Sequence, residues 1–218
     1  QANSGKKTTL PRTTDNKIDG SKLINDWFPS HEAQLFISHS HLDSRTEKRL
    51  ARWLKNTVNR TTYIDSTIWA SADELLHRIG NKYILVRKDK DGTTKYNYKT
   101  RNYTTSHVHM MLSTALVDIM NSTECIIFLN TPASLAVNEV KDQKTNSPWI
   151  YNELKIASII EKKHPREKIL RTRFEKRASI FNEKEKLEIL YPVNHELAIF
   201  DSLEIQHLEW WADCYDNS

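Results

Sequence analysis

A single carboxylate interrupts an apolar stripe near residue 150 of the sequence. Four residues recur at the i, i+4, i+7 and i+11 spacing of one helix face: Trp149, Glu153, Ile156 and Ile160. A bare carboxylate is costly to bury, so this residue must be solvated at a cleft, paired, or protonated through a raised pKa. Glu153 is therefore either a helix-edge side chain that extends into solvent or a candidate catalytic group.

A second group of polar candidates follows a short apolar run. The run over residues 33–38 suits a buried strand, and Ser38-His39-Ser40-His41 comes at its end. In open α/β sheets, ligands bind at the carboxyl ends of the strands. We therefore expect Ser38, His39 and His41 to line a binding pocket, with solvation of the turn as the alternative for the two histidines.

The sequence predicts no metal site. The turn at residues 38–41 and the segment Ser106-His107-Val108-His109 both contain a His-x-His pattern, and together they could supply enough ligands for a metal. On a helix, however, His107 and His109 would point roughly 200° apart, because successive residues turn by about 100°. This geometry argues against shared coordination.

The elements that must position these residues alternate between strands and helices. We predict strands over residues 33–38, 61–65, 124–130, 168–174 and 187–193, with helices that begin near residues 44, 71, 105, 147 and 203. The run at 124–130 is apolar almost throughout, which is typical of a strand covered on both faces. The pattern predicts an α/β fold with an open, mostly parallel five-stranded sheet and helices on both faces.

Several helix starts carry capping signals. Ser147 can act as an N-cap, and Pro148 suits the first helical position, where its missing N–H is not needed. The segments Ser44–Glu47 and Ser71–Glu74 both fit a capping box. Asp43 is expected either to cap the helix that follows it or to lie in the pocket.

The organisation along the chain is that of one decorated domain. Residues 1–22 are poor in apolar side chains and predict a flexible leader, followed by a single domain over residues 23–218. Residues 82–103 read as a β-hairpin around the Asp89–Gly92 turn, inserted into the main fold.

Composition excludes several classes of function. The 32 basic and 28 acidic residues give a net charge of only +4, too small an excess to indicate a nucleic-acid groove. No apolar stretch is long enough to predict a membrane span. The four glycines form no phosphate-binding loop, and the two cysteines suit a reducing cytoplasm.

Three segments, in this order, resemble the TIR (Toll/interleukin-1 receptor) domain family. Leu35–Asp43 resembles its opening FISxSxxD segment, Glu124–Asn130 its central strand, and Ser147–Leu154 the S-x-W-x-x-x-E-L segment of its plant and bacterial enzymes. The resemblance covers residues 33–165 and the last strand and helix, and it implies a flavodoxin-like fold. The leader and the 82–103 hairpin fall outside it.

The resemblance implies cleavage of NAD⁺ at the nicotinamide–ribose bond, with Glu153 as the catalytic residue and NAD⁺ as substrate; no cofactor is expected. Departure of nicotinamide leaves an oxocarbenium-like ribose, which a nearby carboxylate stabilises. Trp149 is expected to stack on a substrate ring, with core packing as the alternative. Trp69 occupies the place of the family's BB loop and is expected to line the pocket, although Asp65–Ala70 lacks the R-D-x-x-P-G pattern.

Within the family, a standalone domain resembles bacterial antiphage proteins of the Thoeris type. That resemblance implies a cytoplasmic enzyme that self-associates through TIR–TIR contacts and makes an ADP-ribose-derived signal, such as cyclic ADP-ribose, for a separate effector. Two alternatives stay open. One is a non-catalytic TIR adaptor, and the other is an enzyme that hydrolyses an N-glycosidic bond in another nucleotide.

Overall fold

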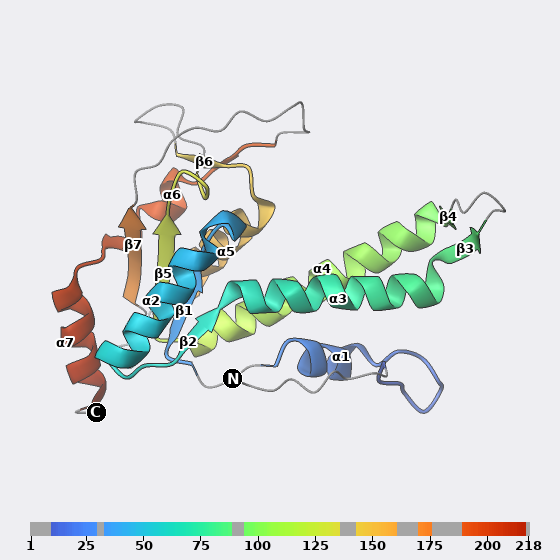
Figure 1. Ribbon diagram of the computed structural model, residues 1–218, viewed down its shortest axis with the longest axis horizontal. Coiled ribbons are helices and arrows are strands. Elements are labelled where there is room, and N and C mark those ends of the chain that lie inside the picture. Colours follow the sequence, from blue (N-terminus) through green and yellow to red (C-terminus); the bar gives the residue numbers. More distant parts are fainter. Residues whose placement is uncertain are drawn as a thin grey trace. The chain divides into compact units, whose positions relative to one another are not determined.

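The computed structural model describes residues 10–29, 33–88, 94–135, 143–160, 170–175 and 189–216 of the chain (Figure 1). Contacts between Cα atoms divide the chain into two compact units, residues 1–30 with 67–116 and residues 31–66 with 117–218. Helices α3 (Asp65–Tyr83) and α4 (Tyr98–Ser122) each contain residues of both units. The single domain over residues 23–218 stays a prediction.

The unit that contains the sheet is organised around three parallel strands. Strand β1 (Leu35–Ser38) lies between β2 (Thr62–Ile64) and β5 (Cys125–Asn130). Strands β7 (Leu170–Glu175) and β9 (Asp201–Ser202) continue beyond β5, which gives the order β2-β1-β5-β7-β9. Because these pairings are parallel, the carboxyl ends of β1, β2 and β5 share one edge of the sheet, the edge at which α/β proteins bind ligands.

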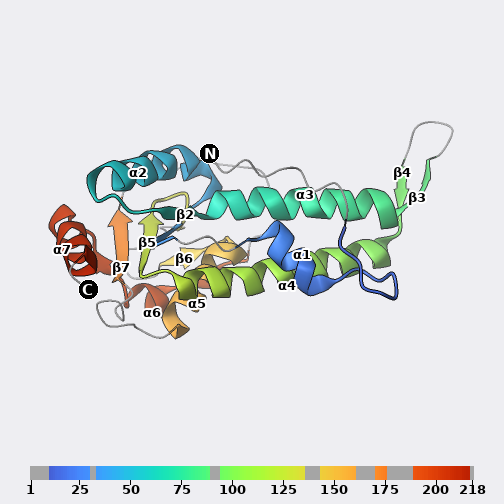
Figure 2. The ribbon, with the colours of Figure 1, turned by 90° about the horizontal axis from the view of Figure 1, so that it is seen from below.

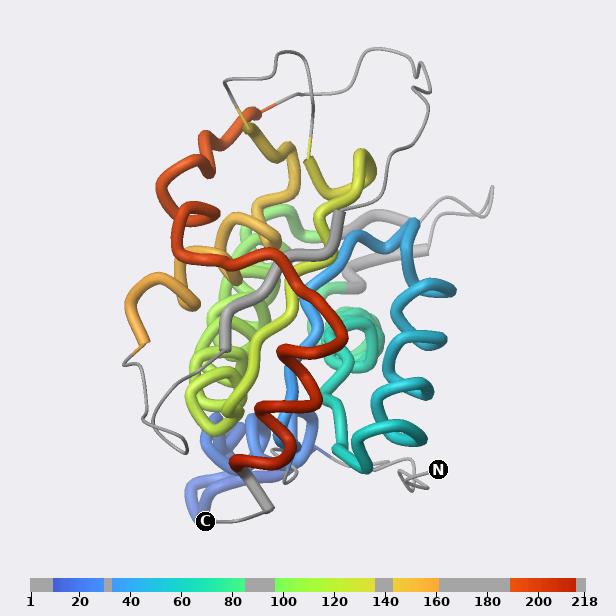
Figure 3. The backbone as a smooth tube through the Cα atoms, turned by 90° about the vertical axis from the view of Figure 1, so that its left-hand side faces the viewer, coloured from blue at the N-terminus to red at the C-terminus, as the bar shows by residue number. Residues whose placement is uncertain are grey.

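Successive residues of a strand point to opposite faces of the sheet, and the two faces pack against different helices. Leu35 and Ile37 of β1 join a hydrophobic cluster with side chains of α2 (Ser44–Thr57) and α7 (Ile205–Asp216). Helix α5 (Pro148–Ile159) lies on the other side of the strands from α2, as Figures 2 and 3 show. Residues with the parity of Ile37 therefore face α2, and residues with the opposite parity face α5.

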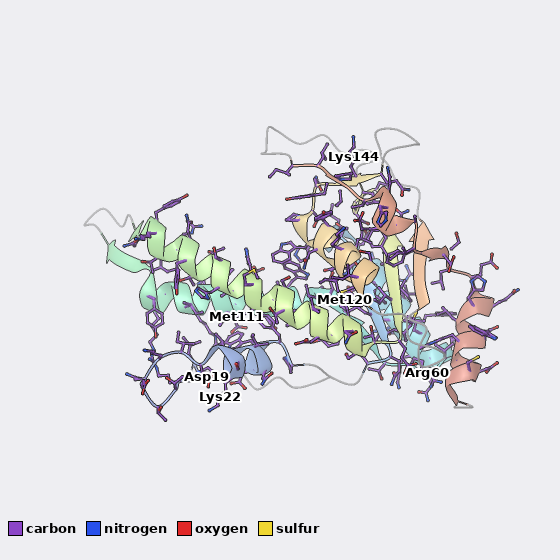
Figure 4. The ribbon with its side chains drawn as sticks, turned by 180° about the vertical axis from the view of Figure 1, so that it is seen from behind. Asp19, Lys22, Arg60, Met111, Met120 and Lys144 are labelled. Atoms are coloured by element: carbon purple, nitrogen blue, oxygen red, sulfur yellow. The ribbon has the colours of Figure 1, made fainter. Side chains whose placement is uncertain are left out.

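Arg60, which precedes β2, ties this strand to helix α7. Its Nη2 donates to the carbonyl oxygen of Ala212 at 3.1 Å, and its guanidinium carbon lies 6.0 Å from the ring centre of Trp211 (Figure 4). The guanidinium is buried, so the carbonyl contact and the aromatic ring replace part of the hydration that it loses. Helix α7 is thereby held on the same face of the sheet as α2.

The α/β class and the open parallel sheet are confirmed, but one predicted strand is misplaced. Of the segment 187–193, residues 187 and 188 lie outside the described part, and β8 (Tyr191–Pro192) pairs antiparallel with β6 (Lys144–Thr145) in a separate ribbon. Pro192 has no N–H to donate to a ladder, which suits it to a short edge pairing. Helix α6 (Asn194–Leu197) follows, and β9 instead pairs with β7.

The predicted loop over residues 65–70 is wrong, because helix α3 begins directly at Asp65. Buried apolar residues at i, i+4, i+7 and i+11 continue the helix: Ile68, Ala72, Leu75 and Ile79. The predicted capping box at Ser71–Glu74 therefore lies inside a helix that has already started.

The capping box predicted at the start of α2 is also wrong. The short helix η1 (His41–Asp43) leads into α2, and Asp43 is its N-cap residue but makes no side-chain capping hydrogen bond. The Asp43 carboxylate instead accepts a hydrogen bond from the Thr131 hydroxyl, at the end of β5. Glu47 is fully buried, and its carboxyl group contacts His39.

The other unit contains α1 (Gly20–Trp27) together with most of α3 and α4. Residues 1–9 of the predicted leader lie outside the described part. Residues 10–22 contain an isolated antiparallel bridge between Arg12 and Ile18, and the side chain of Asp19 caps α1 (Figure 4). Among the described residues, no helix combines the length and the apolar character needed to cross a bilayer.

The hairpin region is shorter than the predicted 82–103. Strands β3 (Leu85–Lys88) and β4 (Thr94–Tyr96) pair antiparallel, and the predicted Asp89–Gly92 turn lies outside the described residues. Helix α3 runs through Tyr83 and α4 starts at Tyr98, so both ends of the predicted hairpin are helical.

Candidate functional site

Glu153 is positioned by a helix whose start was predicted correctly. Ser147 is the N-cap of α5 and its Oγ accepts from the backbone N–H of Ile150 at 3.3 Å, while Pro148 occupies the first turn. This cap fixes the rotation of α5 about its axis, and the buried side of the helix includes Ile150 and Leu154. Glu153 lies on that same side and is only 1% exposed. The carboxylate therefore points into the protein and does not extend to solvent.

The Glu153 carboxylate contacts the carboxyl end of β1. Ser38 is the last residue of β1 and has the parity that faces α5, and its Oγ donates to Oε2 of Glu153 at 2.5 Å. The other oxygen, Oε1, is buried and has no hydrogen-bond partner of good geometry within the described part of the chain. The structure thus brings together Glu153 and Ser38, two of the residues that the sequence placed in one site, and leaves one buried carboxylate oxygen without a hydrogen bond.

Asp65 joins this pair from the neighbouring strand. It follows β2 directly, is 3% exposed, and its carboxyl group is close enough to that of Glu153 for a hydrogen bond between them to act on both pKa values. A carboxyl–carboxyl hydrogen bond requires a proton on one partner, since two carboxylates only accept. Burial and then the negative charge of Glu153 raise the pKa of Asp65 well above its usual range, so Asp65 is the partner that holds the proton.

His39 extends the cluster to the opposite face of the sheet. It follows Ser38, and Glu47 of α2 lies on the face that His39 meets: Nε2 of His39 is 3.0 Å from Oε2 of Glu47. Nδ1 of His39 is 3.6 Å from Oδ2 of Asp65, close enough for charge attraction but beyond a hydrogen bond. The structure therefore does not place His39 at a pocket mouth, because its side chain is completely buried between these two acids.

The cluster is electrostatically coupled. Burial alone lowers the pKa of His39, but the hydrogen bond with Glu47 and the charges of Asp65, Glu47 and Asp43 outweigh burial and raise it. This favours an imidazolium at neutral pH. Burial raises the pKa of Glu153 to about 7, although hydrogen bonds from Ser38 and Asp65 oppose that rise. Glu153 is therefore a carboxyl group that gains and loses its proton near physiological pH, a common property of catalytic acids and bases.

A hydroxyl chain supports the same edge of the sheet from β5. The Thr131 hydroxyl, which donates to Asp43, lies 2.9 Å from Oγ of Ser134. Ser134 Oγ donates to the carbonyl oxygen of Leu129 at 2.6 Å. These contacts connect the end of β5 to the turn after β1, so the two strand ends that flank the cluster are fixed to each other.

Three further residues were predicted to belong to the site: His41, Trp149 and Trp69. His41 starts η1 and is exposed, and Trp149 is half-buried in the first turn of α5, one turn before Glu153. Trp69 is half-buried in α3 and belongs to the other compact unit. Their roles in substrate binding stay predictions.

Sequence reasoning missed Asp65 and Glu47. Asp65 is the last residue of a predicted strand of a parallel sheet, and its place at the carboxyl end of that strand is the signal that could have identified it. Glu47 was hidden by a pattern that also fits a capping box, and no local signal separates the two roles. Among residues that the structure describes, no group of three or more His, Cys, Asp or Glu side chains has the arrangement of a metal site.

Comparison with known proteins gives this site no precedent. No protein-family model, no curated protein and no solved structure matches the chain. The indications of function lie in the buried cluster itself: an ionisable Glu153 with one unpartnered oxygen, the carboxyl group of Asp65 near it, and the His39–Glu47 pair behind them.

Proposed function

We propose that the protein cleaves the bond between nicotinamide and ribose in NAD⁺, with Glu153 as the catalytic carboxylate. The observation that carries this proposal is the state of Glu153: a buried carboxyl group with a pKa of about 7 and a free oxygen at the ligand-binding edge of a parallel sheet. A structural glutamate has no need of either property, because burying an incompletely paired carboxylate destabilises a fold.

The chemistry needs one carboxylate. When the bond between C1′ and the nicotinamide nitrogen breaks, its electron pair goes to the nitrogen, which loses its positive charge, and the ribose becomes an oxocarbenium-like cation. Ionised Glu153 stabilises that cation, and Oε1 accepts a hydrogen bond from a ribose hydroxyl. Nicotinamide leaves as a neutral molecule, so no general acid has to protonate it. Capture of the cation by water, with loss of a proton, gives ADP-ribose; capture by a nucleophile of the same molecule gives a cyclic isomer.

The resemblance to TIR domains supports the choice of substrate. The segments that carry it, Leu35–Asp43 and Ser147–Leu154, contain the two residues in direct contact, Ser38 and Glu153. In this proposal the chain is a five-stranded, flavodoxin-like TIR domain with an insertion at residues 82–103. It acts in the cytoplasm, self-associates, and makes an ADP-ribose-derived signal for a separate effector in bacterial antiphage immunity.

The test is release of nicotinamide from NAD⁺ by the wild type and by Glu153→Gln. The matched control is Glu209→Gln, which makes the same chemical change at an exposed position of α7. We expect loss of one transition-state contact to reduce the rate by about 10²- to 10³-fold in Glu153→Gln, with the control at the wild-type rate. Mass spectrometry of the products then separates hydrolysis from cyclisation.

Two outcomes would overturn the proposal. Equal release by wild type and Glu153→Gln would remove Glu153 from the reaction. Release of a base from another nucleotide, with NAD⁺ left intact, would establish the alternative N-glycosidic hydrolase. Wild-type protein that neither binds NAD⁺ by calorimetry nor turns over any nucleotide would refute an enzyme and leave the adaptor hypothesis.

A further inference from the structure

The cluster contains more ionisable groups than the proposed reaction uses. Glu153 is the only residue to which the proposal gives a chemical step, yet Asp65, His39 and Glu47 are buried beside it and are at most 4% exposed. Each buried charge is costly unless it is compensated. The arrangement of these three residues therefore calls for an explanation beyond packing.

Asp65 lies between a basic group, the imidazole of His39, and an acidic group, the carboxyl group of Glu153. On one side Oδ2 is 3.6 Å from Nδ1 of His39, and on the other side its carboxyl group is close enough to that of Glu153 for a hydrogen bond between them. Ser38 already donates to Oε2 of Glu153 from the end of the neighbouring strand. Glu153 thus has one neighbour at the end of β1 and one directly after β2.

We propose that Asp65 is a positioning residue that acts as a neutral carboxylic acid, donating a hydrogen bond to the Glu153 carboxylate, while the His39–Glu47 pair lies behind it. Its effect on turnover rests on the proposed function; its protonation and its contact with Glu153 do not. Like charges at contact distance cannot both persist in a buried site, so the pair keeps one proton, and Asp65 holds it. The negative charge of the pair then lies on Glu153, whose Oε1 has no hydrogen-bond partner.

His39 and Glu47 set the charge of the surroundings. The titratable groups around Asp65 are His39, Glu47 and Glu153, and Asp43 adds to those that act on His39. Glu47 pairs with the imidazolium at 3.0 Å, and Ser66 Oγ donates to the same Glu47 oxygen at 3.3 Å. The imidazole of His39 therefore lies between Glu47 and Asp65, where a positive charge on it would oppose the negative charge of the acids.

Substitutions at residue 65 separate the neutral-acid role from a charged one. Asn is neutral and its amide N–H can donate to Glu153, so Asp65→Asn is expected to keep turnover of NAD⁺ within about threefold of wild type. Ala cannot donate, so Asp65→Ala is expected to lower kcat by about 10- to 100-fold with little change in KM. The acid limb of its pH–rate profile should also move to higher pH, because Glu153 loses a hydrogen bond that favours its ionised form. Asp73→Asn makes the same chemical change at an exposed position of α3 and serves as the matched control.

A second measurement is independent of turnover. Carbon-13 NMR of side-chain carboxyl groups in the wild type follows the protonation of each Asp and Glu with pH. We expect Asp65 to stay protonated at pH values where surface aspartates have ionised, and Glu153 to titrate at higher pH in Asp65→Ala than in Asp65→Asn.

The outcomes distinguish the two proposals. If Asp65 ionises together with the surface aspartates, or if Asp65→Asn is as inactive as Asp65→Ala, the inference about Asp65 is refuted while the role of Glu153 stands. If NAD⁺ is not turned over but Asp65 is protonated and shifts the titration of Glu153 as described, the positioning inference stands and the proposed function fails. Should Asp65→Ala not fold, the wild-type titration and Asp65→Asn still decide the question.

Discussion

Replacing Glu153 by Gln should make the protein more stable at alkaline pH, and the size of this effect follows from burial. Burial raises the pKa of Glu153 from its ordinary 4.5 to about 7. Between these two values the unfolded chain has released the proton while the folded chain still holds it. Because the folded state binds more protons, the free energy of unfolding falls as pH rises, by about 1.4 kcal/mol per pH unit for one group.

Over the interval from pH 4.5 to pH 7 this single carboxyl group lowers the stability of the wild type by about 3 kcal/mol. The stability that comes from holding the proton on Glu153 is fully present below pH 4.5 and is lost once the pH exceeds the folded-state pKa. Gln has the same shape and no charge, and its amide oxygen can still accept from Ser38. Glu153→Gln therefore avoids the loss, and its advantage over wild type should be small at pH 4.5 and reach about 3 kcal/mol at pH 8.

Urea unfolding of both proteins at a series of pH values from 4.5 to 8 measures this difference. Glu209→Gln is the control, because its exposed side chain is solvated in both states and should change stability by less than about 0.5 kcal/mol throughout. A difference between wild type and Glu153→Gln that does not vary with pH would show that Glu153 ionises as readily in the fold as in water. That result would refute the electrostatic reasoning for the site.

Other predictions concern single contacts. Ser38→Ala removes a donor at 2.5 Å that favours the ionised form of Glu153, so the pKa of Glu153 should rise and the acid limb of the pH–rate profile should move to higher pH; an unmoved limb would contradict this. Ile127→Ala opens a cavity in the centre of β5 and should lower the free energy of unfolding by about 2–5 kcal/mol in urea titrations, whereas Leu42→Ala, at an 83% exposed position, should change it by less than about 0.5 kcal/mol. Ser147→Ala removes the N-cap of α5 and should cost about 1 kcal/mol by the same assay, and Ser147→Asp should recover most of it; equal losses in both variants would rule out the capping role.

The parts of the fold that could be predicted have local signals or follow from parallel-sheet geometry. The start of α5 is encoded by Ser147 and Pro148, and both the cap and the helix are present. The meeting of Ser38 with Glu153 joins residues 115 positions apart, but the carboxyl ends of parallel strands collect at one edge, so two weak motifs could be placed in one site. Sequence therefore located the centre of the cluster.

The parts that could not be predicted depend on partners that are distant or ambiguous. Glu47 fits a capping pattern three residues after Ser44, yet a buried imidazole is a stronger partner than a solvent-accessible backbone N–H, so Glu47 turns inward to His39. Residues 187–193 were assigned to the sheet because they are apolar, but apolar character does not identify a pairing partner, and β8 pairs with β6. Asp65 was read as part of a loop although Ile68, Ala72 and Leu75 carry a helical period.

The energetics of the cluster favour a functional reading over a structural one. A buried set of three carboxyl groups and one imidazole destabilises a fold relative to apolar side chains of similar size, even when each charge has a partner. The neighbouring core shows that apolar packing is available, since Leu35, Ile37 and Ile127 are fully buried on the same strands. If the cluster served the fold, neutralising Glu153 would lower the free energy of unfolding. If it serves catalysis, the same change should raise the free energy of unfolding at pH 8 while activity is lost. Active sites are commonly less stable than apolar packing would make them, because their reactive groups are kept for function.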